Sequence, residues 1–573
     1  MSKHILHIAR VVEVNGAKAI GELETNVSDL YRSYKSRKYA VGQVGSLVRI
    51  DVGNTIVFGI VTSLRMREEL IDGATKTQHS VDPSSDSKWI EIELFGQGEK
   101  NGTEDEDFIF QRGISTYPLP GQGIRLATVE ELKVIYAKPN TPTVKVGSVA
   151  QVKGLPAYLL MDELLGKHFA ILGTTGSGKS CTVALVFQSI LKECPYAHIV
   201  LLDPHNEYPR AFPDQSESID PTKLQLPHWL LNFEESLSVF IGMTEHEATR
   251  QNNILKDAIL NAKKIFPSQV LDLDKITIDS AVPYKISDVV NHITEAKNKL
   301  TESKQDSHLK ILNKIETLKS DKRFSFLLRP DDEIKDNLHE IISDILRIPG
   351  KGKPISIIDL SGIPSDVVDV VVSVLCRLIF DFALWNEKRI QTPLFLVCEE
   401  AHRYVPKKDE AAFQPTKQAL SRIAKEGRKY GVGLCLVTQR ASELSETILS
   451  QCNTIIALRM TNQQDQDFVR RALPDNVSSL VNTLPALQNR EALVVGEGTI
   501  VPLRVFFDEI EESKRPKSSN VAFAAPWKVE ITDNLLVKET IKNWREQNRV
   551  IPTPVTSSTE KVEVQVKSKK KKE

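Results

Sequence analysis

Two patterns of hydrophobic and polar positions divide the chain, and the first covers residues 1–135. Short runs rich in β-branched residues recur there: IARVVEV, AKAIGELE, SLVRIDV, TIVFGIVTSL, WIEIELFG and IRLATV. Asn15-Gly16 and Gly53-Asn54 stand between pairs of these runs, as hairpin turns require. The pattern predicts a small β-barrel over residues 1–135. A barrel alone names no function, and it could be an oligomerisation or docking collar.

From about residue 150, nearly continuous apolar runs alternate with helical segments. The predicted strands are HFAIL, HIVLLD, PISIIDL, LFLVCEE, GLCLVTQ and TIIALRM. Strands of this kind separated by helices are typical of a parallel sheet covered on both faces. We therefore predict an α/β core made of residues 150–215 and 350–485.

The alternation stops between residues 215 and 350, where charged segments with helical periodicity predict a helical insertion. Its charged faces are either solvated or in contact with nucleic acid. Residues 486–555 are predicted to hold a β-hairpin, from REALVVGEG and VPLRVFF, and a brace segment. Residues 556–573 are polar and Lys-rich, which predicts a disordered tail that solubilises the chain or touches DNA phosphates.

Residues 171–180 read ILGTTGSGKS and fit the P-loop pattern Gly-x-x-x-x-Gly-Lys-Ser/Thr. An apolar strand precedes the stretch and the apolar helix CTVALVFQSIL follows it. Glycines allow such a loop to point its N–H groups at a polyphosphate, and the helix N-terminus adds positive charge. The predicted ATP-binding residues are Gly173, Thr174, Thr175, Gly176, Ser177, Gly178, Lys179, Ser180 and Cys181. Lys179 would reach the β- and γ-phosphates and Ser180 would ligate Mg²⁺; a glycine-rich turn without a ligand is the alternative.

A P-loop enzyme also needs an acid on the magnesium side and a group that activates water. Glu399 and Glu400 follow an apolar strand, and the carboxyl ends of parallel strands line the ligand crevice. Glu399 would hold the hydration shell of Mg²⁺ and Glu400 would polarise the attacking water. Gln439 ends the next strand, where it would sense the γ-phosphate or simply form a strand-end hydrogen bond.

An arginine can stabilise the charge that develops during phosphoryl transfer, and in ring ATPases it comes from the neighbouring subunit. Arg428, in KEGRK, is the first candidate, and Arg403, Arg440 and Arg459 follow it; each could also be ordinary surface charge. Asp203 and Glu207, in LLDPHNEY, either orient water or contact a neighbouring subunit, or they form an Asp-Pro turn with a helix cap.

The composition indicates the cellular compartment of the protein but does not identify its ligand. The 573 residues carry a formal net charge of −1, which argues neither for nor against nucleic acid. Six scattered cysteines without a C-x-x-C motif fit a reducing compartment. The start of the chain lacks a signal-peptide core, and no apolar run is long enough to cross a bilayer. We expect a soluble cytoplasmic protein without a membrane contact.

Five motifs together resemble those of the HerA family of hexameric ATPases, relatives of the FtsK DNA pumps in the RecA-like P-loop class. They are ILGTTGSGKS, LLDPHNEY, LVCEEAHRYVP, KEGRKYGVGLCLVTQR and IIALRMTNQQDQDF, and GISTYPLPGQGI looks like the end of the family's N-terminal HAS barrel. The resemblance implies a RecA-like core and a homohexameric ring that uses Mg²⁺ and ATP to move double-stranded DNA without sequence preference. It also implies a nuclease or NADase effector partner, in DNA end processing or in antiviral (anti-phage) defence.

The sequence departs from that family at two places. Glu399 replaces the usual aspartate, and Asn489-Arg490 stand where relatives tend to carry glycine. The favoured function is a hexameric DNA translocase and DNA-dependent ATPase, helicase-like, that works with an effector. An ATP-binding scaffold that assembles and licenses an effector enzyme is the alternative. A protein-pumping or conjugation-type ATPase is a third, weakened by the lack of a membrane anchor.

Overall fold

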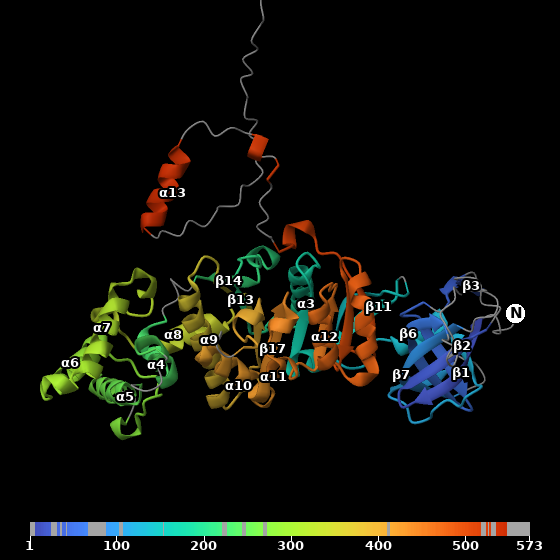
Figure 1. Cartoon of the computed structure of the whole chain (residues 1–573), viewed down its shortest axis with the longest axis horizontal. Helices are drawn as coiled ribbons and strands as arrows, with labels where there is room; N and C mark the ends of the chain where they lie inside the picture. Colours follow the sequence, from blue (N-terminus) through green and yellow to red (C-terminus); the bar gives the residue numbers. More distant parts are fainter. Residues whose placement is uncertain are drawn as a thin grey trace, which may run out of the picture. The chain divides into compact units, whose positions relative to one another are not determined.

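The structure is a computed structural model in two compact units, residues 1–518 and 519–573. It describes residues 6–24, 31–34, 37–41, 43–66, 88–101, 107–152, 154–220, 226–242, 248–266, 272–408, 413–516, 523–524, 526–528 and 534–546. The first unit holds the barrel, the α/β core and the helical insertion (Figure 1).

A six-stranded β-barrel occupies the N-terminal part of the first unit. Its strands follow the order β2-β1-β9-β5-β6-β7, and pairing of β2 with β7 closes the ring. Their bounds are β1 (His7–Asn15), β2 (Lys18–Leu23), β5 (Leu47–Val52), β6 (Thr55–Met66), β7 (Lys88–Lys100) and β9 (Gly123–Leu126). Each coincides with one of the six hydrophobic runs, so the predicted barrel is confirmed.

Glycines form the two predicted hairpin turns of the barrel. Asn15 pairs with Lys18 across the first, and Val52 pairs with Thr55 across the second. Gly16 and Gly53 have φ angles of 57° and 61°, a left-handed conformation that costs glycine little. Three short strands were not predicted, because their few residues show no clear alternation. These are β3 (Tyr31–Tyr34), β4 (Arg37–Ala40) and β8 (Phe108–Arg112).

Helix α1 (Val129–Ile135) connects the barrel to the core, and a buried ion pair anchors it. The Thr128 hydroxyl accepts a hydrogen bond from the Glu131 N–H at 3.2 Å, and Glu131 Oε2 accepts from the Thr128 N–H at 2.7 Å. This capping box satisfies two backbone donors at the start of the helix. The other Glu131 oxygen pairs with the buried guanidinium of Arg49 on β5. The start of α1 is therefore fixed to the barrel wall.

The core is one eleven-stranded sheet in the order β11-β10-β20-β19-β18-β12-β17-β16-β13-β15-β14. Its strands are β10 (Thr143–Val149), β11 (Pro156–Leu160), β12 (Phe169–Leu172), β13 (Ile199–Asp203), β14 (Ser216–Ile219), β15 (Ile355–Asp359), β16 (Leu394–Cys398), β17 (Val432–Thr438), β18 (Thr454–Leu458), β19 (Glu491–Gly496) and β20 (Leu503–Phe507). The segment from β18 to β14 is parallel throughout, and the remaining pairings are antiparallel. The six predicted strands are β12, β13, β15, β16, β17 and β18, which confirms a mostly parallel α/β core.

Helices cover both faces of this sheet. They are α2 (Met161–Gly166), α3 (Lys179–Glu193), α9 (Ser365–Trp385), α10 (Gln414–Tyr430), α11 (Glu446–Leu449) and α12 (Gln463–Ala472). The crossover from β12 to β13 runs in the opposite direction along the sheet from those joining β15 to β16 and β16 to β17. Right-handed crossovers therefore place α3 on one face and α9 and α10 on the other, where α9 and α10 pack together.

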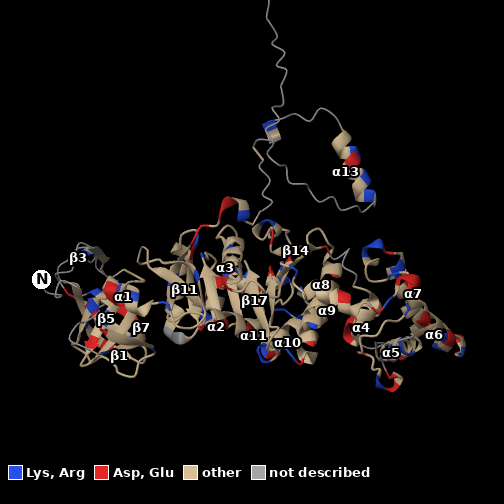
Figure 2. Cartoon of the chain, turned by 180° about the vertical axis from the view of Figure 1, so that it is seen from behind, with Lys and Arg blue, Asp and Glu red and all other residues tan. Residues whose placement is uncertain are grey.

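The helical insertion comprises α4 (Phe233–Phe240), α5 (Ala248–Ile265), α6 (Ile286–Asn298), α7 (Asp306–Ser320) and α8 (Leu338–Leu346). Strand β14 lies inside the range that the sequence predicts as helical; its four residues, SESI, are too few and too polar to show a strand pattern. Arg377 on α9 pairs with the buried Glu235 of α4 at 3.0 Å, which ties the insertion to the core. Lys and Arg lie among Asp and Glu along these helices (Figure 2).

The turn before β19 contains Asn489-Arg490, where the sequence departs from the HerA pattern. Arg490 has a φ of 69°, a left-handed conformation that glycine adopts without strain. Its guanidinium donates to the Phe507 carbonyl at 2.9 Å and lies 3.3 Å from Glu509. These side-chain contacts stabilise the turn, which begins the predicted β19–β20 hairpin.

The second unit contains a short helical turn, Pro526–Lys528, and α13 (Leu535–Glu546). Leu535, Leu536, Val537 and Trp544 of α13 are each more than half exposed. The Lys-rich tail, 556–573, lies outside the described residues. Among the helices that the structure describes, none combines the length and the apolar character needed to cross a bilayer.

Glu93 predicts a pH dependence of stability. This residue of β7 is 2% exposed, and its Oε1 accepts a hydrogen bond from the Ser479 hydroxyl of the core. Burial raises the pKa of Glu93 from 4.5 to about 7, although Ser479 and Lys18 oppose the shift. Folding therefore takes up a proton between these pH values, and the stability contributed by protonated Glu93 is lost as the pH rises through 7.

We expect Glu93→Gln to remove this dependence, because glutamine is neutral and keeps the acceptor for Ser479. The advantage of the variant over the wild type in free energy of unfolding should grow by about 1 kcal/mol between pH 6 and pH 8. Denaturant unfolding at the two pH values measures it. Glu91→Gln, on the same strand but with a more exposed side chain, is the matched control; an equal change in both variants would contradict the assignment.

Candidate active site

Five parallel strands end at the same edge of the sheet, and the predicted site residues follow them. The P-loop follows β12, Asp203 ends β13, Glu399 and Glu400 follow β16, Gln439 follows β17, and Arg459 follows β18. In sheet order β17 lies between β12 and β16. The side chain of Gln439 therefore starts between the P-loop and the two glutamates.

The P-loop combines left-handed glycines with a close approach to a neighbouring strand. Gly176 and Gly178 have φ angles of 75° and 98°. Gly173 lies outside that region and has a different reason to be glycine: a Cβ there would lie 2.7 Å from Ser177 Oγ and 2.9 Å from Leu458 Cβ. Thr174 closes the loop, because its N–H and its hydroxyl each donate to the Arg459 carbonyl at 3.1 Å.

Lys179 begins α3, and its ammonium donates to the Thr174 carbonyl at 3.3 Å. Burial lowers the pKa of Lys179, and the charges of Glu399, Glu400 and Glu207 oppose this shift. The charges of three carboxylates thus act on one lysine. Ser180 and Cys181 follow on the first turn of the helix, half-buried.

Glu399 is 6% exposed and both of its carboxylate oxygens have a donor. Oε1 accepts from the Tyr208 hydroxyl, and Oε2 accepts from the Glu400 N–H at 3.2 Å. Burial raises the pKa of Glu399 to about 7, against the hydrogen bond from Tyr208 and with the help of the Glu400 charge. Its carboxylate is therefore fixed in place before any ligand binds.

Glu400 has a left-handed backbone with a φ of 51°, which is uncommon for a residue with a side chain. His402 Nδ1 lies 3.3 Å from its Oε2 and 2.9 Å from Thr438 Oγ1, and His205 Nε2 lies 3.9 Å from Oε1. Oε2 is buried and accepts no hydrogen bond from the residues that the structure describes. A buried carboxylate oxygen without a donor is available to a bound water.

Gln439 contacts the P-loop directly. Its Oε1 accepts a hydrogen bond from the Thr175 hydroxyl. The residue predicted to sense the γ-phosphate is thus attached to the loop that would hold that phosphate.

Arg428 lies at the opposite edge of the sheet from the P-loop. It is on the last turn of α10, just before β17 begins, and is exposed. A Cβ on the preceding residue, Gly427, would lie 3.5 Å from His168 Cε1, which places Arg428 near the residue that precedes β12. His168 and Gly173 are five strand positions apart, about 17 Å. Arg428 therefore cannot reach the P-loop of its own chain.

The other arginines have their own surroundings. Arg440 pairs with Glu443 at 2.8 Å, and Arg403 is exposed beside the turn that follows Glu400. The backbone of Arg459 supports the P-loop, as described above.

Asp203 shapes the loop that follows β13. Its buried carboxylate accepts from the N–H groups of His205 at 3.2 Å and Tyr208 at 3.0 Å. This agrees with the Asp-turn alternative. Burial raises the pKa of Asp203 to about 6. Glu207 is half-buried, and its charge acts on Lys179.

Sequence reasoning missed two residues that contact the glutamates, Tyr208 and His402. Both lie inside motifs that were singled out, LLDPHNEY and LVCEEAHRYVP. The sequence signal for these two residues was the same as for the glutamates, namely a polar side chain a few residues after a buried strand. Their partners could not be known until β13, β16 and β17 were placed side by side.

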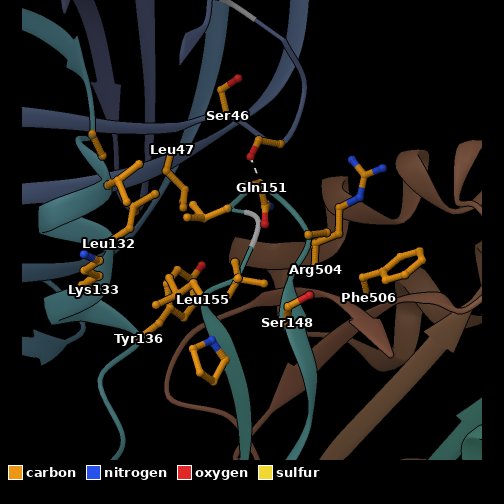
Figure 3. A pocket seen from close by; sticks show the side chains of 18 of the residues that line it. Ser46, Leu47, Leu132, Lys133, Tyr136, Ser148, Gln151, Leu155, Arg504 and Phe506 are labelled. Carbon is orange, nitrogen blue, oxygen red and sulfur yellow. Dashed lines mark hydrogen bonds between the residues drawn. The ribbon is translucent and has the colours of Figure 1, made fainter. Parts of the chain in front are cut away.

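A separate cavity of about 1230 Å³ lies between the barrel and the core. Figure 3 shows Ser46 and Leu47 from the barrel, Tyr136 after α1, and Gln151 and Arg504 from the core side. Gln151 donates to the Gly45 carbonyl at 3.4 Å, and Arg504 pairs with Glu491. None of the P-loop residues or the two glutamates lines it, so the cavity is distinct from the candidate active site.

A P-loop at a helix N-terminus, followed across the sheet by two buried glutamates and a polar strand end, defines a P-loop ATPase. The chain is an ATP hydrolase of this class.

The particular family follows from its relatives. The family model for the central domain of helicase HerA matches residues 144–379. The DNA double-strand break repair helicase HerA of Sulfurisphaera tokodaii is 30% identical over 405 residues, which cover 69% of this chain and 74% of that protein. The HerA of Sulfolobus acidocaldarius is 27% identical over 438 residues, 74% of this chain and 80% of that one. The chain belongs to the HerA family.

Among solved structures, the VirB4 of Thermoanaerobacter pseudethanolicus is similar with a TM-score of 0.45 and 14% identity. That similarity covers 66% of this chain and 99% of VirB4.

Lys179→Ala tests the assignment of the P-loop. We expect the affinity for ATP to fall about a hundredfold, because a charge-assisted contact to phosphate is worth about 2–3 kcal/mol. Titration of a fluorescent ATP analogue measures it. Lys192→Ala, at the other end of α3, should leave the affinity unchanged. Unaltered affinity in Lys179→Ala would place the nucleotide elsewhere.

Proposed function

We propose that this chain is the subunit of a homohexameric ring that hydrolyses Mg²⁺-bound ATP to move double-stranded DNA. The observation that carries the proposal is the joint placement of the P-loop, Glu399, Glu400 and Gln439 at one edge of the sheet in a HerA-family chain. The relatives are described as DNA double-strand break repair helicases. We propose that this chain also acts on DNA.

The residues fit ATP and Mg²⁺ together. The N–H groups of the P-loop and the N-terminus of α3 would hold the phosphates, with Lys179 on the β- and γ-phosphates. Ser180 and Glu399 would hold the metal, Glu399 through water. The charges of Glu399, Glu400 and Glu207 act on Lys179, and a divalent cation would neutralise their excess of negative charge. When bound, Mg²⁺ supplies charge neutralisation of the phosphates.

Glu400 would accept the proton of the attacking water. Its left-handed backbone directs the side chain, and His402 and His205 lie 3.3 Å and 3.9 Å from its two oxygens. A fixed acceptor within hydrogen-bond reach of the nucleophile is what general-base catalysis requires. Gln439 would exchange its hydrogen bond with Thr175 for one to the γ-phosphate or the attacking water, and so report the state of the nucleotide.

The position of Arg428 supports a ring. It lies too far from its own P-loop to act there, but it is exposed on the α10 surface, where a neighbouring subunit can meet it. Lys417, Lys425 and Lys429 lie on the same helix, whose basic residues are visible in Figure 2. We propose that Arg428 completes the site of the adjacent subunit.

DNA would be held without base readout, through phosphate contacts in the centre of the ring. We further propose that the hexamer lies in the cytoplasm and that an effector nuclease or NADase uses the ring in DNA end processing or antiviral defence.

ATP hydrolysis by the purified full-length chain, with and without linear duplex DNA, tests the proposal. A translocase should be stimulated severalfold by duplex DNA and should displace a triplex-forming strand from it. Mass photometry should show a six-chain particle. Hydrolysis that ignores DNA, with no displacement, would refute translocation and favour an ATP-binding scaffold for an effector.

A further inference from the structure

We propose that Tyr208 is a positioning residue of the ATPase site: its hydroxyl holds the Glu399 carboxylate in the orientation from which hydrated Mg²⁺ is bound. This inference rests on the proposed Mg²⁺-ATP site. It gives the LLDPHNEY motif a function through Tyr208, a residue to which the sequence alone assigned no role.

Hydrogen bonds within the loop after β13 fix the position of Tyr208. The Asp203 carboxylate accepts from the backbone N–H groups of His205 and Tyr208, and Asn206 between them has a φ of 54°. A side chain that accepts from backbone two residues on stabilises such a turn. Since Asp203 is 1% exposed, the turn is anchored inside the core and not at the surface.

Tyr208 itself has little freedom. Its side chain is 1% exposed and packs within the hydrophobic core of the unit. A buried hydroxyl needs a hydrogen-bond partner, and the partner here is Glu399 Oε1. The strands that carry the two residues, β13 and β16, are parallel neighbours, and the Glu399 N–H donates to the Leu202 carbonyl at 3.3 Å. Donor and acceptor therefore come from adjacent strand ends.

The unusual glutamate explains why such a contact is needed. Glu399 has one more methylene group, and so one more rotatable bond, than the aspartate usual at this position. The Tyr208 hydroxyl and the Glu400 N–H engage one oxygen each and select a single orientation. Both donors are neutral, so neither cancels the negative charge that an ionised Glu399 would offer to a metal. A lysine or arginine in the place of Tyr208 would neutralise it.

The chain offers a matched control in Tyr404. It is 2% exposed and lies a few residues after Glu399, but its hydroxyl has no hydrogen-bond partner among the described residues. Tyr208→Phe and Tyr404→Phe both remove one buried oxygen and keep the ring. A merely structural effect should appear in both variants, whereas a positioning effect should appear only in Tyr208→Phe.

The experiment measures Mg²⁺-dependent binding of a fluorescent ATP analogue to full-length protein carrying Glu400→Gln, so that turnover does not interfere. We expect Tyr208→Phe to raise the Mg²⁺ concentration for half-maximal binding about tenfold or more, because the variant removes a hydrogen bond to a charged group. Binding measured in EDTA should not change. Tyr404→Phe should match its parent.

A second variant guards against misfolding of the first. Glu399→Asp is one methylene too short to reach the Tyr208 hydroxyl, so it should raise the Mg²⁺ midpoint, and adding Tyr208→Phe to it should have no further effect. An unchanged midpoint in Tyr208→Phe, equal shifts in both tyrosine variants, or additive effects with Glu399→Asp would overturn the inference. If the parent protein bound no nucleotide at all, the proposed function would fail instead.

Discussion

Glu400→Gln should lower the rate of ATP hydrolysis by about 10²–10⁴-fold, the usual contribution of a positioned general base. Glutamine keeps the size of the side chain but cannot accept a proton. The surroundings of Glu400 support its role as the general base. The residue is buried, and its Oε2 has no hydrogen-bond donor among the described residues although His402 Nδ1 lies 3.3 Å from it. Steady-state hydrolysis with saturating Mg²⁺ and ATP measures the loss.

ATP binding is the necessary companion measurement. The affinity of Glu400→Gln for a fluorescent ATP analogue should equal or exceed that of the wild type, because the variant removes a negative charge near the phosphates. Glu426→Gln, exposed on α10, should hydrolyse ATP normally. Turnover by Glu400→Gln within a few-fold of the wild type would assign the base to another group.

Arg428→Ala should produce a ring that assembles, binds ATP and hydrolyses it about 10³–10⁵-fold more slowly, the range found for arginines that act from a neighbouring subunit. The prediction follows from distance: Arg428 lies near His168, about 17 Å along β12 from the P-loop. The substitution should therefore reduce ATP hydrolysis at the site of the next subunit and not at the site of its own subunit.

Mixed rings distinguish this from a local defect. Arg428→Ala subunits have intact P-loops, and Lys179→Ala subunits have intact arginines, so co-assembled rings should regain part of the activity that each variant lacks alone. Lys425→Ala, one turn earlier on α10 and also exposed, is the control. Mixed rings without any recovery would remove the support for action in trans.

Much of the fold was predictable because its signals are local. Six apolar runs predicted six of the seven strands from β12 to β18, and six β-branched runs predicted the barrel. The P-loop was equally visible, since Gly-x-x-x-x-Gly-Lys-Ser is contiguous. Strand β14 was not predictable, because SESI is too short and polar for a pattern, and its place in the sheet depends on its neighbour β15.

The site was predictable at the level of residues but not of contacts. Asp203 was a candidate for orienting water, and only the structure shows its carboxylate turned toward the backbone of its own loop. The hydrogen bonds of Tyr208 with Glu399 and of Thr175 with Gln439 join positions 191 and 264 residues apart. No pattern along the chain reports such pairs, because sheet order creates them.

Strand β17 connects the two regions that the proposed ring would use for ATP hydrolysis. It ends at Gln439 beside the P-loop, and at its other end Gly431 joins it to the helix that carries Arg428. The strand is buried along its whole length and hydrogen-bonded on both sides, so it is stiff. If Arg428 acts on the next subunit, each β17 connects two nucleotide sites. The site of its own subunit lies at the Gln439 end, and the site of the next subunit lies at the Arg428 end. In the proposed ring, a change at one nucleotide site would then be transmitted along β17 to the neighbouring site.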